Sequence, residues 1–500
     1  MSETNTMSMR RLSRPPTADE ENNLASAPPG TLHRSGTDVW NRFLRKGKKK
    51  VGLLPSLKAV VYSSWLNVLV VFIPIAFIAH FSNTNNREDP EKIFPFPVTF
   101  VLCFLAIVPL EKAFDYCGEQ MGFYLGPDLG ELLIITLNNT VEATLAIILL
   151  KKCELRLLQS TIIGVVVLHL LLVPGVAFVT GGVRLVEQEL HPHLTQLNQS
   201  LLTIGVLTLL LPASFFAALD HGAPPTTAEA AAESAVNDST RDVLLQMSRG
   251  LAVILVAVYI CSRIFLHNPP GENIELADHK SAPQALKAKA KNIEAEEPEV
   301  SQWVCIVVIA ITIAIMAVTA EFLVETVDRV REEGQISEEF FGLVLLPLIS
   351  YSGDGFLSVI FFLRGWYRHL RGIRTPPGHL ANARPIDLSI QFTLFWMPFI
   401  VLLGWWTNRP LLLLFDLFEV ALIIGSCLIV NYVTADSKTN WCEGFAMVSF
   451  YCMIALCALY YDGQEEVRLM LGENCRSVIE TIEHAAEGLL AGASAAAESH

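Results

Sequence analysis

Residues 130–152 read GELLIITLNNTVEATLAIILLKK, an apolar stretch with a short polar centre that contains Glu142. The hydrocarbon core of a bilayer is about 30 Å thick and requires roughly 20 consecutive, mostly apolar residues in a helix that crosses it. Because lipid contains no water to satisfy open backbone groups, such a stretch is expected to be helical. The stretch therefore predicts a membrane-spanning helix with a carboxylate near its middle.

Ten further stretches of similar character occur along the chain. Hydrophobic residues make up 52% of its 500 residues and charged residues 17%, against about 25% charged in soluble domains. This composition, with a net charge of −14, excludes a disordered chain, a fibrous repeat and a basic nucleic-acid-binding protein. No nucleotide-binding or hydrolytic motif occurs, so an enzyme is not expected. We predict an all-α polytopic membrane protein with about eleven transmembrane helices, at residues 64–81, 97–116, 129–150, 157–181, 198–219, 242–266, 301–324, 340–363, 385–406, 411–432 and 442–461.

A second stretch, FFGLVLLPLISYSGDGFLSVIFFLRG at residues 340–365, resembles the first when Asp354 is aligned with Glu142. A leading span and five further spans precede the longest interior polar stretch, and five spans follow it. Because five is odd, the second half enters the membrane from the opposite side. We therefore predict one leading helix and two five-helix inverted repeats, an arrangement that places a binding site near mid-membrane between the halves.

The polar segments define the remaining organisation. The predicted parts are a disordered cytosolic arm at 1–50, the leading helix and first repeat at 64–266, a cytosolic linker at 267–300, the second repeat at 301–461 and an acidic tail at 462–500. Helices are expected in the linker around 283–297 and in the tail near 473–490. Basic residues gather before the first span and after the sixth and eighth, which predicts a cytosolic N-terminus and a lumenal C-terminus. Lys151, Lys152 and Arg156 fall on the opposite face and disagree with this orientation.

Two carboxylates lie mid-span, where each costs about 2.5–3.5 kcal/mol on insertion scales. A bound hard cation offsets this cost most simply, because calcium and similar ions prefer oxygen ligands. The alternative is a protonated or hydrogen-bonded carboxylate. Further oxygens come from an amide on the helical face of Glu142 and from polar residues that open the fourth and ninth spans, unless these serve helix-to-helix hydrogen bonds. The predicted metal ligands are Glu142, Asp354, Asn139, Gln159, Ser389 and Gln391.

Other polar residues each have two possible roles or an expected position. His169 lies mid-span and is a candidate for carrying a coupled proton, because an imidazole titrates near neutral pH; the alternative is a packing residue. Glu111 and Lys112 end the second predicted span and are expected to reach the membrane interface. The ten cysteines show no zinc-binding spacing and lie mostly inside spans, which favours packing roles. No resident cofactor is expected.

Three stretches are the most distinctive: FGLVLLPLIS at 341–350, IQFTLFWMPFIVLLGWW at 390–406 and FDLFEVALIIGSCLIVNYVTADSKTNWCEG at 415–444. They resemble the calcium/proton antiporters of the CAX family, within the cation/calcium exchanger superfamily, especially the fungal vacuolar members. The resemblance covers about residues 64–461. It implies exchange of calcium or another cation for protons by alternating access, in a vacuolar membrane or another endomembrane. The first helix of each repeat, here the second and seventh spans, slides over the rest in such folds.

The resemblance also implies a site, from which this chain departs. The family holds calcium with a Gly-Asn-Ala-x-Glu motif in each repeat. The first reads Asn138-Asn139-Thr140-Val141-Glu142 here, and the second reads Ser350-Tyr351-Ser352-Gly353-Asp354 without the following His. Asp354 in place of Glu withdraws the carboxylate by about 1.5 Å. As a hypothesis, His169 takes over part of the lost proton role.

The altered second motif keeps two other functions open. One is a transport-inactive scaffold that regulates another transporter, and the other is a passive cation channel. The expected partners are calcium or another cation, protons and the lipid bilayer, with no nucleic acid. Ion selectivity, stoichiometry and oligomeric state stay open.

Overall fold

A computed structural model describes residues 40, 43–44, 51–85, 94–183, 185–190, 192–219, 236–267, 297–371, 384–472 and 475–483. The chain divides into two compact units, Met1–Lys46 and Gly47–His500. In the first unit Trp40 stacks on Phe43. The second unit contains all the predicted spans and is described below. The predicted disordered arm and the predicted linker helix at 283–297 lie almost wholly outside the described residues.

The described part of the second unit is mostly helical. Its α-helices are α3 (Leu53–Tyr62), α4 (Phe72–Asn85), α5 (Phe96–Leu125), α6 (Pro127–Asn138), α7 (Thr140–Lys152), α8 (Leu155–Val167), α9 (Val173–Gly182), α10 (Pro192–Ala217), α12 (Asp238–His267), α14 (Gln302–Gly334), α15 (Glu338–Phe340), α16 (Leu346–Leu370), α17 (Arg384–Gln391), α18 (Met397–Trp406), α19 (Leu417–Val433), α20 (Trp441–Ala458) and α21 (Glu465–Leu471). A 3₁₀ helix, η2 (Trp65–Val71), precedes α4. The strands β1 (Gln188–Glu189) and β2 (Lys438–Thr439) pair antiparallel, with Gln188 opposite Thr439.

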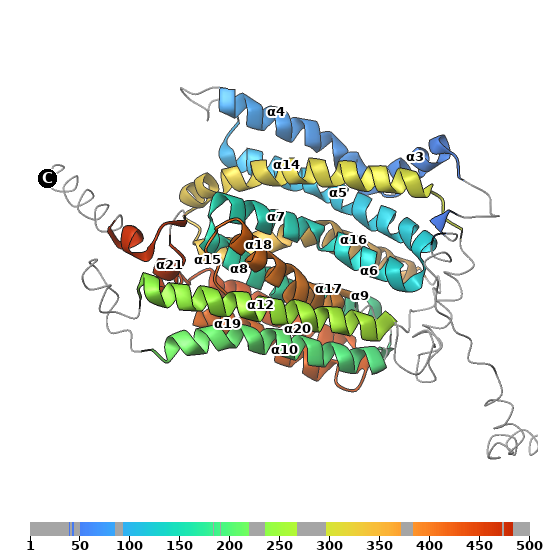
Figure 1. Cartoon of the computed structure of the whole chain (residues 1–500). Coiled ribbons are helices and arrows are strands. Elements are labelled where there is room, and N and C mark those ends of the chain that lie inside the picture. The colour runs from blue at the N-terminus through green and yellow to red at the C-terminus, as the bar shows by residue number, and fades with distance from the viewer. Residues whose placement is uncertain are drawn as a thin grey trace, which may run out of the picture. The chain divides into compact units, whose positions relative to one another are not determined.

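The long helices of this unit run in a common direction, with α5 and α14 side by side (Figure 1). Within the described residues, nine helices are long and apolar enough to cross a membrane. The bent pair of α6 and α7 makes a tenth if it is counted as one span. The prediction of an all-α polytopic membrane protein is confirmed, whereas the count of eleven is not.

The predicted span at 411–432 accounts for the difference between the eleven predicted spans and the ten candidates in the structure. Residues 411–416 are buried but not helical, and α19 begins only at Leu417. Asp416 caps this helix, and a capping box with Glu419 fixes its start. The resulting helix has 17 residues, at the short end of the roughly 17–25 that a membrane-spanning helix uses. The start of this predicted span was therefore wrong, because apolar content continues where helical geometry does not.

Three π-helical turns interrupt the inner helices. They are η4 (Leu168–Leu172), η5 (Phe341–Leu345) and η6 (Phe392–Trp396). Each ends two residues before a proline, at Pro174, Pro347 and Pro398. Proline lacks an N–H group and crowds the carbonyl four residues earlier, so a widened turn before it relieves the helix. η4 lies in the fourth predicted span, η5 in the eighth and η6 in the ninth. The three turns shape the backbone around the centre of the bundle.

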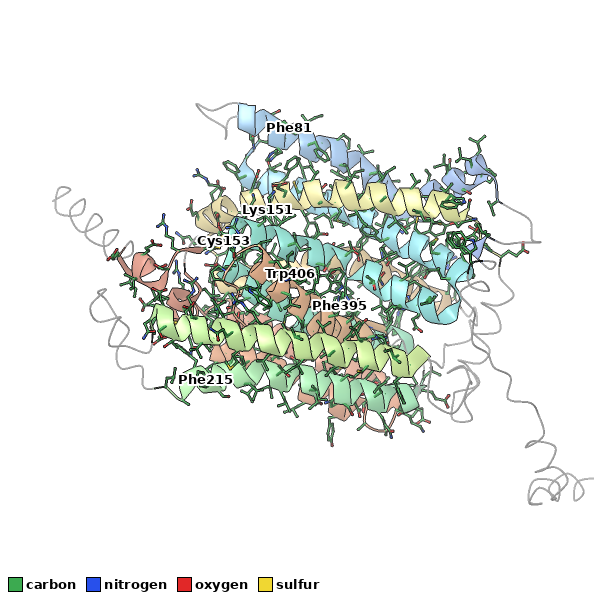
Figure 2. All side chains as sticks on the ribbon, viewed as in Figure 1. Phe81, Lys151, Cys153, Phe215, Phe395 and Trp406 are labelled. Atoms are coloured by element: carbon green, nitrogen blue, oxygen red, sulfur yellow. A yellow bond between two sulfur atoms is a disulfide. The ribbon has the colours of Figure 1, made fainter. Side chains whose placement is uncertain are left out.

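Two of the segments that carry these turns, Leu155–Gly182 and Arg384–Trp406, are the most buried of the long apolar helices described. Every residue of α8 is buried. α8 packs closely on η5, since a Cβ atom on Gly164 would lie only 2.4 Å from the Leu343 carbonyl oxygen. Outer helices instead present large apolar side chains such as Phe81 and Phe215, which are exposed and suit a lipid environment (Figure 2). The polar side chains of α8 and α17 are thus held in the interior.

The acidic tail agrees with its prediction in part. Residues 478–483 are helical, within the helix expected near 473–490, whereas residues 484–490 lie outside the described residues. A further helix, α21 at Glu465–Leu471, precedes residues 478–483. Between them Cys475 forms a disulfide with Cys153, which follows α7. The packing role expected for all cysteines was therefore wrong for this pair, whose members are separated by 322 positions in the sequence.

Candidate functional site

The site begins at the break between α6 and α7. The helix axes bend by 48° here, at Asn139. The Asn139 side chain is fully buried, and its amide nitrogen donates to Gln391 Oε1 at 2.8 Å and to the Leu388 carbonyl at 3.3 Å. Its Oδ1 atom has no hydrogen-bond partner among the described residues. The break therefore directs one unsatisfied amide oxygen into the interior.

Glu142 lies in the first turn of α7, one turn after Asn139. It is 2% exposed, and its Oε1 atom is 3.6 Å from Nε2 of His169 on η4. The second oxygen, Oε2, and Nδ1 of His169 lack partners within the described part of the chain. The N-terminal turn of a helix has free N–H groups and a partial positive charge, which favour a carboxylate there. Glu142 and Asn139 thus offer two buried, unsatisfied oxygens to a cation.

The other predicted ligands divide into two groups. Gln391 lies beside Asn139, and its amide nitrogen donates to Thr136 and Tyr259, at 2.9 Å each. Ser389, two residues earlier on α17, donates instead to the Val166 carbonyl at 3.3 Å. Gln159 donates to the Leu412 carbonyl at 2.8 Å, and its Oε1 has no partner in the described ranges. The structure thus joins Gln391 to Asn139 by a hydrogen bond, whereas the contacts of Ser389 and Gln159 lead to backbone carbonyls.

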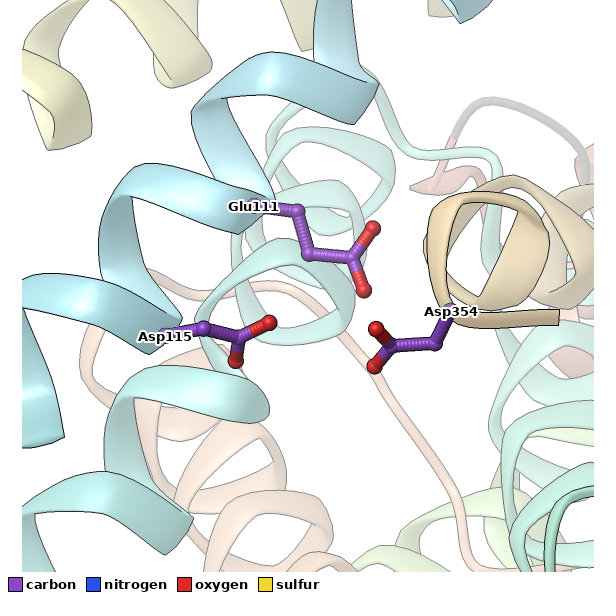
Figure 3. A group of neighbouring side chains, drawn as sticks. All are labelled: Glu111, Asp115 and Asp354. Atoms are coloured by element: carbon purple, nitrogen blue, oxygen red, sulfur yellow. The ribbon is translucent and has the colours of Figure 1, made fainter. Parts of the chain in front are cut away.

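Asp354 lies on α16, with its side chain 48% exposed. In the described residues no hydrogen bond or ion pair joins it to Glu142; it pairs instead with Lys112 on α5. One oxygen each from Asp354, Glu111 and Asp115 lie within 4.8 Å of one another (Figure 3). Asp354 therefore lies in a group with two carboxylates of α5.

The expectation that Glu111 and Lys112 reach the membrane interface was wrong. α5 runs from Phe96 to Leu125, so both residues lie at its middle, and they are only 8% and 7% exposed. The apolar pattern of the sequence stops near these charges, so they appeared to mark the end of the span. The helix itself continues, because the two charged side chains face partners in the protein rather than lipid. The spacing of Glu111 and Asp115 was an available signal, since residues four apart share a helical face.

A separate polar network lies around Arg156, near the start of α8. Its guanidinium is 2.6 Å from Glu339, 3.2 Å from Asp416 and 3.5 Å from Glu419. Ser160 Oγ is 2.6 Å from Glu339 Oε2 and 2.7 Å from Glu419 Oε1. A hydroxyl carries one hydrogen, so one of these two contacts requires a proton on a carboxylate. The network thus holds three buried carboxylates, one guanidinium and at least one shared proton.

The same region explains the basic residues that disagreed with the predicted orientation. Arg156 is buried among carboxylates. Lys151 pairs with Glu321 at 3.1 Å and Lys152 with Glu325 at 3.0 Å, both on α14. Each base of this loop is therefore neutralised by an acidic partner.

Glu154 lies in the turn between α7 and α8, outside the membrane-spanning segments. Burial, with Asp328 and Glu338 nearby, raises the pKa of its carboxyl to about 7 from 4.5. The ionised carboxylate therefore destabilises the fold, and this destabilisation grows as the pH rises from 4.5 towards 7. We expect Glu154→Gln to raise the melting temperature at pH 8 and to leave it unchanged near pH 4. The effect is at most about 1 kcal/mol, since the side chain is partly exposed to solvent. Melting curves of detergent-purified protein at both pH values test this, and an equal shift at both would contradict it.

Apolar helices that surround buried carboxylates and amide oxygens define an integral membrane protein with a polar interior. The sodium/calcium exchanger protein family model matches residues 95–267 and 304–460. The chain belongs to this family, and its matched relatives are transporters rather than enzymes.

Relatives that match most of the chain support this assignment. The chain is 30% identical to a vacuolar calcium ion transporter of Schizosaccharomyces pombe, over 81% of this chain and 87% of that protein. A vacuolar calcium ion transporter of Cryptococcus neoformans var. grubii is 29% identical, over 90% of this chain and 82% of that protein. The solved structure of native YfkE matches with a TM-score of 0.57 and 18% identity, over 80% of this chain and 100% of that chain. At that identity the structural match shows the fold alone.

Proposed function

We propose that this protein exchanges calcium, or another divalent cation, for protons across a vacuolar membrane or another endomembrane. The observation that carries the proposal is the pair of buried, unsatisfied oxygens on Glu142 and Asn139 at the α6–α7 break. An unpaired buried carboxylate oxygen is costly, and a hard cation is the ligand that removes this cost. The vacuolar calcium ion transporters among its relatives support calcium as a substrate. The Ca(2+)/H(+) antiporter of Synechocystis, another relative, supports exchange of calcium for protons.

Transport follows by alternating access. A cation binds at Glu142 and Asn139, with Asp354 as the contribution of the second half. Protons compete for the same carboxylates, so loading of one substrate releases the other. The 3.6 Å distance between His169 and Glu142 supports a role for the imidazole in accepting one of these protons. Unchanged pH dependence of transport in a His169→Ala variant would contradict that role.

Uptake of radiolabelled calcium or manganese into sealed vesicles tests the function itself. We expect uptake that requires an imposed proton gradient and stops when an ionophore collapses it. Flux that ignores the gradient would identify a passive channel. Absence of flux under any cation gradient would identify a transport-inactive scaffold.

We further propose that the end of the bundle with the Cys153–Cys475 disulfide faces the lumen. Figure 2 places Lys151 and Cys153 at this end, and the tail joins it through Cys475. Disulfides persist in oxidising compartments and are rare in the cytosol. This position supports a lumenal C-terminus. The second unit begins at α3, which lies at the opposite end of the bundle (Figure 1), and this supports a cytosolic N-terminus.

Thiol labelling tests the orientation. In sealed cytosol-side-out vesicles, the two cysteines are expected to stay unlabelled by a membrane-impermeant maleimide, even after treatment with an impermeant reductant. After detergent permeabilisation the same reductant should expose both. A Cys153→Ser/Cys475→Ser variant identifies the signal. Labelling of intact vesicles after the impermeant reductant would reverse the orientation.

A further inference from the structure

The charged residues at the middle of α5 form a group of their own with Asp354. The Lys112 ammonium is 2.7 Å from Asp115 Oδ2 and also contacts Asp354 Oδ1. Figure 3 shows the carboxylates of Glu111, Asp115 and Asp354 directed toward a common space. An ammonium group in contact with two of these three carboxylates stands where a bound metal ion would be expected.

We propose that Lys112 is a tethered cation. Its ammonium occupies a second cation site formed by Glu111, Asp115 and Asp354, and the transported divalent cation must displace it from Asp354 to bind there. This inference rests on the proposed function, because it assumes that a cation reaches Asp354. In this proposal Glu111 and Asp115 on α5 take the place of ligands that the altered second motif lacks.

An unsatisfied oxygen shows that the lysine alone does not complete this group. Glu111 is more than nine-tenths buried, and its Oε2 atom has no partner in the described parts of the chain. Calcium accepts six to eight oxygen ligands. Three carboxylates supply most of these ligands, whereas one ammonium cannot satisfy all of their oxygens. If Lys112 contacts Asp115 alone, Glu111 and Asp354 leave two negative charges, which one divalent cation balances.

The local geometry allows that exchange. Asp115 lies three residues after Lys112 on the same helix, so it can retain the ammonium after Asp354 is released. Lysine has a flexible four-carbon stem and three rotatable donors, which suits movement between partners. α16 comes close because residue 353 is glycine: a Cβ there would lie 3.3 Å from Lys112 Cε and 3.4 Å from Glu111 Oε2.

Equilibrium binding of radiolabelled calcium to the purified full-length protein in detergent tests the proposal without requiring transport. Lys112→Met keeps the length of the stem and removes the charge that competes with calcium, so its affinity is expected to rise about tenfold. Lys112→Arg keeps a cation in place and should bind calcium no more tightly than the unsubstituted protein. Lys152→Met, which removes a lysine paired with Glu325 instead, is the matched control and should leave affinity unchanged.

The outcomes separate this inference from the proposed function. Equal or weaker calcium binding by Lys112→Met, in a chain that still transports, would overturn the tethered cation alone. Thermal unfolding with and without calcium controls for folding: the calcium-induced rise in melting temperature should be larger for Lys112→Met than for the unsubstituted protein. Absence of calcium binding in every variant would overturn both proposals.

Discussion

Glu142→Gln is expected to abolish proton-gradient-driven calcium uptake while the protein still folds. The substitution preserves size but removes the carboxylate at the start of α7, so the site loses both the charge that binds a cation and the group that exchanges it for a proton. The buried, unpaired Oε2 of Glu142 is the direct reason for expecting complete loss. Uptake of radiolabelled calcium into sealed vesicles is the measurement.

Glu187→Gln is a matched control for this prediction. Glu187 is exposed, and its partner Lys438 is also on the surface, so the same chemical change there should leave uptake intact. Asp354→Asn is expected to reduce uptake as well, since it removes the contribution of the second half. Uptake that persists in both Glu142→Gln and Asp354→Asn would show that neither carboxylate holds the cation.

Arg156→Ala is expected to lower the free energy of unfolding by about 3–5 kcal/mol, the usual cost of leaving a buried charge without its partner. Glu339, Asp416 and Glu419 are buried around this one guanidinium. Removal of Arg156 forces these carboxylates to take up protons or admit water. Thermal and denaturant unfolding of detergent-purified protein, followed by tryptophan fluorescence, measures the loss.

Lys151→Ala controls for the loss of a basic side chain from the same loop. The Lys151–Glu321 pair is largely exposed, so its removal should cost less than about 1 kcal/mol. Arg156→Lys should fall between the two, because a lysine keeps the charge but not the forked geometry that reaches three partners. A stability change for Arg156→Ala no larger than that for Lys151→Ala would mean that the network does not depend on the guanidinium.

Local composition was sufficient to locate most spans and to identify Glu142 as a carboxylate within one of them. Hydropathy sums over adjacent residues, and a carboxylate in an apolar block is visible without knowledge of its neighbours. The same reasoning failed for Glu111 and Lys112, because charges at the apparent end of an apolar block look the same whether they face water or partners on another helix. It also misplaced the start of α19, where Asp416 and Glu419 terminate an apolar stretch by forming a helix cap.

The membrane class and the mid-span position of the first carboxylate follow from residues 130–152, because insertion into lipid depends on the continuous apolar length of a segment. The partners of the buried charges follow only from the folded chain. Lys112 meets Asp354 across 242 positions of sequence, and Cys153 meets Cys475 across 322. Such pairs depend on how helices cross, which the periodicity of a single helix does not encode.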